Sequence, residues 1–404
     1  GHALTVTNGV FAECAMFAAG DQNYPGTAWF RLDGGSLTCA THFVAGRYYP
    51  GLATLESGSL YGGGDFFVGS QIGAFGAVTN NGAAVHFNNV VLAAYTATSS
   101  CVFAQSGGCV TARLDVTVGY RGNALAELNA GVLSVGRTCF VGRATGSCGI
   151  FVLNGGSVTG KTSAIVGEAG QGVAALNGGT VGVTGDLRIG NVAGGAGTVT
   201  NTGAAVTAAN IQAGYQAGAY GRLIHTGGTL AASDSLQIGR NGGIGECELD
   251  APVSAKTMII GTGFAPTVPG TGTVTVAENA VGTVDEYLRV NNGALFMRGG
   301  QIHLRNVGNP NRTNLYVRTG EDRRGQLRGW GYVGYTNENI TLRLVNNGMI
   351  VADGEGEERD LDLNMFAVVN NDIPNGFAGT NGWYAVNKGS VRYPRTWQTY
   401  SSGT

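Results

Sequence analysis

The sequence predicts an all-β protein, a single-stranded right-handed parallel β-helix (solenoid) with coils of about 24 residues and an irregular C-terminal cap. Three observations support this prediction. Glycine makes up 71 of the 404 residues, only 12% of residues are charged, and 43% are hydrophobic. One glycine recurs at nearly constant spacing, and apolar residues follow it at strand spacing. Because the chain is apolar enough to form a core, its glycine content does not indicate disorder.

The repeat is anchored on a glycine that recurs every 23 to 26 residues as Gly9, Gly35, Gly58, Gly82, Gly108, Gly131, Gly156, Gly179, Gly203 and Gly228. A second glycine follows 11 residues after nearly every anchor, with Ala93 in the one coil that lacks it. All variation in length occurs between this second glycine and the next anchor. We therefore expect one corner of the coil to accept insertions while the rest of the coil keeps a fixed length.

Each coil contains three short stretches in which apolar residues alternate with other residues, as at Leu187 and Ile189. Period-2 alternation predicts β-strands, and three strands in so short a unit fit a parallel β-helix with coils ~4.8 Å apart. A polar residue stands two positions before the anchor in consecutive coils, as Asn129, Asn154, Asn177 and Asn201. We expect these amides to hydrogen-bond from coil to coil as a ladder.

The repeat divides the chain into three segments. Residues 1–262 form regular coils, residues 263–349 continue as irregular and arginine-rich coils, and residues 350–404 form a C-terminal cap or docking segment. A terminal unit that differs from the middle is expected in a solenoid, since a bare strand edge pairs readily with other chains.

The coil at 172–190, GVAALNGGTVGVTGDLRIG, resembles the β-helices of secreted bacterial proteins of the autotransporter-passenger and pectate-lyase types. The resemblance covers roughly residues 1–260 and lies in the style of the repeat, because no catalytic motif of those families can be matched. It implies an extracellular or cell-surface location and an adhesive or structural role. The first residues enter a strand pattern directly, as expected of a processed chain.

Three cysteine pairs, each one coil apart or close in sequence across a corner, are candidate disulfides: Cys14/Cys39, Cys101/Cys109 and Cys139/Cys148. Disulfides would suit secretion. The alternative is that these cysteines are small buried hydrophobic residues. Cys247 stands in a row that leucine occupies in other coils, so we expect it to be a buried free thiol.

The sequence contains no recognisable catalytic motif, so we expect a non-enzymatic protein without a cofactor. Lys+Arg (24) nearly balance Asp+Glu (26), which argues against binding nucleic acid. The apolar runs are far shorter than the ~20 residues that span a bilayer, so no transmembrane segment is expected. The best metal candidate is a Ca²⁺ site in the acidic run, from carboxylates at Asp353, Glu355, Glu357, Asp360 and Asp362. The alternative is a solvated or arginine-paired acidic loop.

Aromatic residues gather in the corner that accepts insertions, at Tyr24, Tyr48, Tyr49, Phe75, Tyr95, Tyr120, Tyr215, Tyr220 and Phe264. In phase with the repeat, they predict an aromatic edge that contacts a protein or stacks on glycans. The alternative is that the rings only cover the neighbouring coil.

Together these features favour a non-enzymatic, secreted structural protein, the subunit of an extracellular filament or surface layer that assembles by homotypic contacts. A glycan-binding surface adhesin is the alternative, with its aromatic edge as the binding surface. A polysaccharide lyase or hydrolase is a weaker hypothesis, because no cluster of acidic and basic residues can be named for it.

Overall fold

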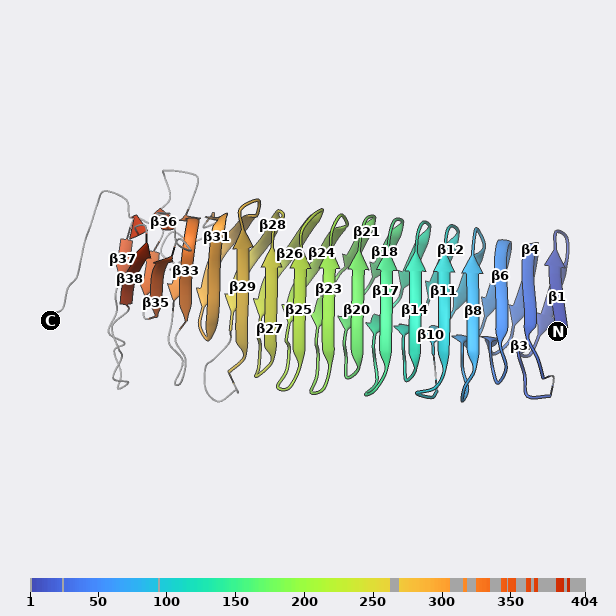
Figure 1. The fold of residues 1–404 in the computed structure, drawn as a ribbon. Helices are drawn as coiled ribbons and strands as arrows, with labels where there is room; N and C mark the ends of the chain where they lie inside the picture. Colours follow the sequence, from blue (N-terminus) through green and yellow to red (C-terminus); the bar gives the residue numbers. More distant parts are fainter. Residues whose placement is uncertain are drawn as a thin grey trace. The chain divides into compact units, whose positions relative to one another are not determined.

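The computed structural model describes residues 2–23, 25–93, 95–261, 269–305, 315–317, 325–334, 343–346, 348–353, 361–364, 367–369, 383–388 and 391–392. It divides the chain into two compact units, Gly1–Ala208 and Ala209–Thr404. The described residues form strands and turns but no helix, and therefore no helix that could cross a membrane. Each unit is a parallel β-solenoid, which confirms the predicted fold class (Figure 1).

Each coil of the first unit passes through three parallel sheets, here called A, B and C. Sheet A contains β1 (His2–Thr7), β4 (Ala28–Cys39), β6 (Gly51–Gly62), β8 (Phe75–Asn80), β11 (Ser100–Gln105), β14 (Asn123–Leu128), β17 (Cys148–Leu153), β20 (Gln171–Leu176) and β23 (Ala196–Asn201). Sheet B contains β2 (Phe11–Cys14), the later parts of β4 and β6, β9 (Ala84–Phe87), β12 (Cys109–Ala112), β15 (Val132–Val135), β18 (Ser157–Gly160), β21 (Thr180–Val183) and the start of β24 (Ala205–Ala213). Sheet C contains β3 (Phe17–Ala19), β5 (Phe43–Ala45), β7 (Asp65–Val68), β10 (Asn89–Leu92), β13 (Val116–Val118), β16 (Thr138–Val141), β19 (Ser163–Val166) and β22 (Asp186–Ile189).

The coils of the second unit also pass through three parallel sheets, labelled A, B and C in the same order along the chain. Sheet A contains β25 (Tyr220–His225), β27 (Ile244–Leu249), β29 (Thr271–Ala277), β31 (Gly293–Leu304), β33 (Gln326–Gly334), β35 (Met349–Asp353) and β38 (Trp383–Lys388). Sheet B contains the first parts of β26 (Thr229–Ile238), β28 (Val253–Ile260) and β30 (Val281–Val290), the later parts of β31 and β33, β36 (Leu361–Asn364) and β39 (Val391–Arg392). Sheet C contains the later parts of β24, β26, β28 and β30, then β32 (Leu315–Val317), β34 (Arg343–Asn346) and β37 (Ala367–Val369).

The strand register follows the sequence repeat. Asn123 pairs with Cys148 and Cys148 with Gln171, so these coils are 25 and 23 residues apart. Because a strand alternates its side chains, one set points into the coil and one set points outward. The same position in successive coils therefore forms a row, either inside or on the surface.

The inward rows form a closed apolar core. In sheet C of the first unit, Phe17, Phe43 and Phe66 stack along the coil axis with ring centroids 5.0 and 5.2 Å apart. Phe87 packs its ring 5.3 Å from Phe66. A Cβ at Gly62, on the preceding coil, would overlap the Phe87 ring, so glycine at that position makes room for the phenylalanine.

The second glycine of the repeat ends each sheet C strand and starts the C–A corner, the turn that leads back to sheet A. Gly142 has a φ of 72°, in the left-handed region, and an added Cβ would overlap the carbonyl oxygen of Gln171 on the next coil. Glycine is required there for both its φ and its lack of a side chain. Ala93 takes the same left-handed conformation, with a φ of 55°.

The predicted asparagine ladder forms, but its last member is wrong. Asn154 donates to Asn129 at 2.7 Å, Asn177 donates to Asn154 at 2.8 Å, and the hydroxyl of Thr202 donates to Asn177 at 3.1 Å. Asn201 pairs in register with the inward Leu176 instead. It is fully buried, and its side-chain oxygen accepts the backbone N–H of Ala204 at 2.9 Å. The anchor glycine used for this coil, Gly203, is displaced by one residue, and a displacement of one residue exchanges the inward and outward faces of a strand.

Candidate functional site

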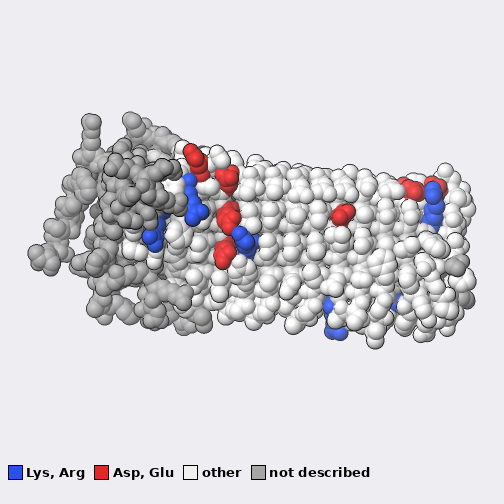
Figure 2. All heavy atoms as spheres, viewed as in Figure 1, with Lys and Arg blue, Asp and Glu red and all other residues white. Residues whose placement is uncertain are grey.

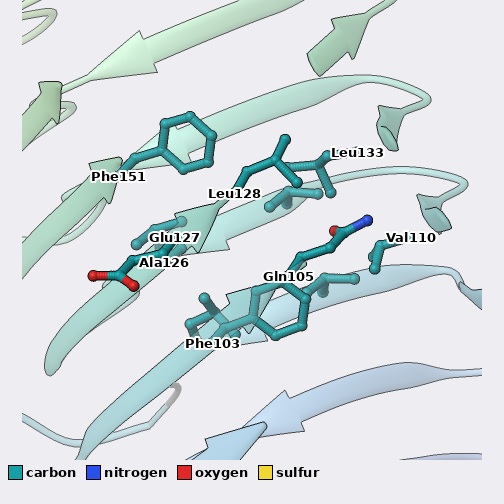
Figure 3. A pocket seen from close by; sticks show the side chains of 12 residues that line it. Phe103, Gln105, Val110, Ala126, Glu127, Leu128, Leu133 and Phe151 are labelled. Atoms are coloured by element: carbon teal, nitrogen blue, oxygen red, sulfur yellow. The ribbon is translucent and has the colours of Figure 1, made fainter. Parts of the chain in front are cut away.

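The cavities found inside the first unit are too small to hold a ligand. One cavity, of about 10 Å³, lies beside the buried Gln105, among Phe103, Leu128 and Phe151 (Figure 3). A second, of about 40 Å³, is lined by apolar side chains such as Ile165. Ligand sites usually measure ~300 Å³ or more. The candidate functional residues are therefore sought on the outer faces.

The outer face of sheet A in the first unit is almost free of charge. Six of its nine strands, β8, β11, β14, β17, β20 and β23, together contain one charged residue, Glu127. Figure 2 shows this surface as a broad white area with a single acidic group. Other charges of this face lie near its start, where Arg31 pairs with Asp33 at 3.2 Å and approaches Glu56 at 3.8 Å.

Aliphatic side chains form a continuous row along the middle of this surface. The strand register stacks Ala77, Val102, Leu125, Ile150 and Val173 in consecutive coils. Ile150 is 38% exposed and Val173 39% exposed, so the row is open to solvent. Trp29, which is 49% exposed, and Leu52 continue the row toward β4. We call this surface, from Trp29 to Thr198, the sheet A face.

The second unit differs on its corresponding face. The outward Arg222 of β25 donates to Glu248 of β27 at 2.7 Å, and the Tyr220 hydroxyl donates to Glu246 at 2.8 Å. Since exposed ion pairs keep their water, this face has the character of an ordinary solvated surface. The near absence of charge is thus a property of the sheet A strands from β8 to β23, and it does not follow from the repeat itself.

The predicted aromatic edge is divided between two locations. Phe75 and Tyr220 are the first residues of sheet A strands, whereas Tyr48, Tyr49, Tyr95, Tyr120 and Tyr215 lie in C–A corners. Tyr24 and Phe264 lie outside the described residues. The glycan and protein-contact roles assigned to these residues stay predictions.

Several corner tyrosines are covered by arginines. The guanidinium of Arg143 lies 5.3 Å from the ring centroid of Tyr120, one coil earlier, and Arg240 lies 5.1 Å from Tyr215 in the same relation. Arg47 lies 5.4 Å from Tyr48 within one corner. These distances suit cation–π interactions, so the rings also stabilise the stacking of coils.

Two of the predicted aromatic residues, Tyr95 and Tyr120, line a groove on the outer face of sheet C. The groove has a volume of about 310 Å³ and crosses β7, β10 and β13, and Arg137 and Arg143 of the next coil complete its lining. Its floor is the outward row of those strands, Phe67, Val91 and Thr117. We call it the sheet C groove.

One rim of the sheet C groove is a hydrogen-bonded polar row at the strand starts. Asn89 donates to Asp65 at 2.7 Å, and its side-chain oxygen accepts the backbone N–H of Asp115 at 3.1 Å. Asp115 accepts two hydrogen bonds from Arg137, at 2.9 and 2.5 Å, and one from the N–H of Thr138 at 3.1 Å. Each of these side chains thus receives a backbone amide or a side chain from the next coil.

Asp115 is only 5% exposed, yet its pKa is not raised. Burial raises its pKa, but the hydrogen bonds from Arg137 and from the Thr138 N–H, with the positive charge of Arg137, together hold the pKa below its ordinary value. A buried carboxylate is stable when it is paired in this way. The rim therefore presents fixed charges whose positions are set before any ligand arrives.

All seven cysteines are free thiols in the structure, so none of the three candidate pairs is bonded. Cys14 and Cys39 are directly stacked in register, with their Sγ atoms 3.4 Å apart. Burial raises the pKa of Cys101 and Cys139 to about 12. Cys247 is buried, 2% exposed, and its pKa is raised for the same reason.

Most of the predicted Ca²⁺ ligands, Glu355, Glu357 and Asp360, lie outside the described residues, and of Asp353 and Asp362 only the strand positions are described. No group of His, Cys, Asp or Glu suited to a metal occurs within the part of the chain that the structure describes.

Comparison with known proteins yields no relative. No family model matches the chain, and no curated protein or solved structure is significantly similar to it.

Proposed function

We propose that the chain is a non-enzymatic, secreted structural protein, and that its first unit pairs with a second copy through the sheet A face. An extracellular filament or surface layer is the assembly that such homotypic contacts would build. The observation that supports this function is the continuous uncharged row from Trp29 to Val173.

The size of the sheet A face fits a stable dimer. Eight strands spaced ~4.8 Å apart and six residues long cover roughly 34 by 20 Å, or roughly 700 Å² per copy. Standard protein interfaces bury about 800 Å² per partner. Exposed apolar patches larger than a few hundred Å² usually mark interaction sites in soluble proteins.

A second copy is the partner that best matches this surface. The rows repeat with the coil spacing, so the rows of two identical faces have the same period and pack as two sheets do in a sandwich. A two-fold contact of this kind is self-complementary. A filament or layer requires one further contact, for which the proposed segment is residues 350–404.

The test is self-association of the full chain, measured by sedimentation velocity. Val102→Lys and Ile150→Lys place unpaired charges at the centre of the face, and we expect association to weaken at least tenfold. Ser134→Lys adds the same charge to sheet B and is the control, which should associate like the wild type. A wild type that stays monomeric at high concentration, or equal loss in all three variants, would refute the proposal.

A further inference from the structure

The sheet C groove contains a feature that the solenoid does not require. Thr117 is 1% exposed, and its hydroxyl has no hydrogen-bond partner. It occupies the row in which Phe67 and Val91 precede it and Phe140 follows. Buried hydroxyls nearly always have a partner, because an unsatisfied one costs about 1–3 kcal/mol. An apolar residue would therefore serve the fold better at this position.

The groove combines aromatic surface with fixed hydrogen-bonding groups. Tyr95 packs its ring 5.4 Å from that of Phe67 on the floor, and Tyr120 lies one coil further along. Opposite them stand the oxygens of Asp65 and the amide of Asn89, which have hydrogen-bonding capacity beyond the bonds described above. Aromatic faces suit the C–H surface of a sugar ring, and carboxylates and amides suit its hydroxyls.

The charge of the groove indicates a neutral ligand. Two carboxylates, Asp65 and Asp115, are balanced by two guanidiniums, Arg137 and Arg143. Arg137 is occupied by its paired bonds to Asp115, and Arg143 lies 4.2 Å from the centroid of the Phe140 ring. A polyanion would need an excess of positive charge, which these residues do not provide.

The groove is also elongated. It crosses three successive sheet C strands, a distance of about 10 Å along the coil axis, and Arg137 and Arg143 extend its lining into the next coil. We propose that the sheet C groove binds a short neutral oligosaccharide, which stacks on Tyr95 and Tyr120 and gives the Thr117 hydroxyl its hydrogen-bond partner. This site lies on a different face from the one proposed for self-association and does not depend on it.

The experiment uses the full chain and a panel of neutral oligosaccharides (β-linked glucose, mannose, xylose and N-acetylglucosamine) beside uronate oligosaccharides. Binding is measured by isothermal titration. Tyr95→Ala with Tyr120→Ala should abolish binding. Thr117→Val should weaken binding about three- to tenfold, the loss of one hydrogen bond, while the melting temperature stays the same or rises.

Tyr215→Ala removes an arginine-covered corner tyrosine that does not line the groove. As the control it should bind like the wild type. Neutral oligosaccharides that fail to bind, a preference for uronates, or full affinity in Thr117→Val would each overturn the proposal. Because Thr117→Val should not lower stability, its loss of affinity cannot be attributed to unfolding.

Discussion

A close approach between coils predicts different costs of substitution for two glycines four residues apart. Gly142 and Gly146 both have left-handed φ values, 72° and 79°. A Cβ at Gly142 would overlap the Gln171 carbonyl of the next coil, whereas nothing lies within 4 Å of one at Gly146. Both alanine variants therefore incur the same backbone strain, and only Gly142→Ala must also displace a neighbouring coil.

The expected losses of unfolding free energy follow from the backbone strain and from the displacement of the neighbouring coil. Left-handed φ costs an alanine about 1–2 kcal/mol, which is the whole effect expected for Gly146→Ala. Overpacking adds about 1–3 kcal/mol, so Gly142→Ala should lose about 2–5 kcal/mol. We expect urea denaturation followed by circular dichroism to show this difference. Hydrogen exchange should locate the loosening in Gly142→Ala at Gln171 and Gly172 on the next coil.

Equal destabilisation of the two variants would refute the reasoning. It would mean that the carbonyl at Gln171 moves away freely and that the corners do not fix the coil spacing.

Three further predictions concern the core. Burial lowers the pKa of His225, so the folded chain keeps the imidazole neutral and unfolding takes up a proton. The free energy of unfolding should therefore be highest above pH ~6.5 and fall below that pH by at most about 1.4 kcal/mol per pH unit. His225→Leu should remove this slope from melting curves measured at a series of pH values. Mild oxidation should join Cys14 to Cys39, which peptide mass spectrometry would detect, and closing this loop should add about 3 kcal/mol; an unchanged denaturation midpoint would contradict it. Gly62→Ala should destabilise strongly, and Phe87→Leu in the same chain should restore much of the loss; additive effects in the denaturation midpoints would exclude the contact.

The solenoid was predictable because its signals are local. Glycine spacing fixed the coils, and the left-handed φ at positions such as Gly142 needs no knowledge of distant residues. The wrong prediction for Asn201 also comes from relying on a local signal. Near an anchor, a shift of one residue exchanges the inward and outward faces of the strand. A single sequence cannot show which residue belongs to the turn and which to the strand.

The sheet A face could have been found from the sequence, because Val102, Leu125 and Ile150 occupy equivalent positions in consecutive coils. The sheet C groove could not have been found in this way. It requires corner residues such as Tyr95 to lie over the strands, and a hydroxyl at Thr117 that lacks a partner, and both depend on side-chain placement.

The most direct test of the assembly proposed for the sheet A face uses two native thiols. Cys148 is partly exposed on sheet A, beside Ile150, and Cys109 is partly exposed on sheet B. Maleimide labelling of each thiol should be followed by mass spectrometry as the protein concentration rises. Labelling of Cys148 should slow as the protein associates, while labelling of Cys109 stays constant. Association that leaves the labelling rate of Cys148 unchanged would show that the copies meet through another surface.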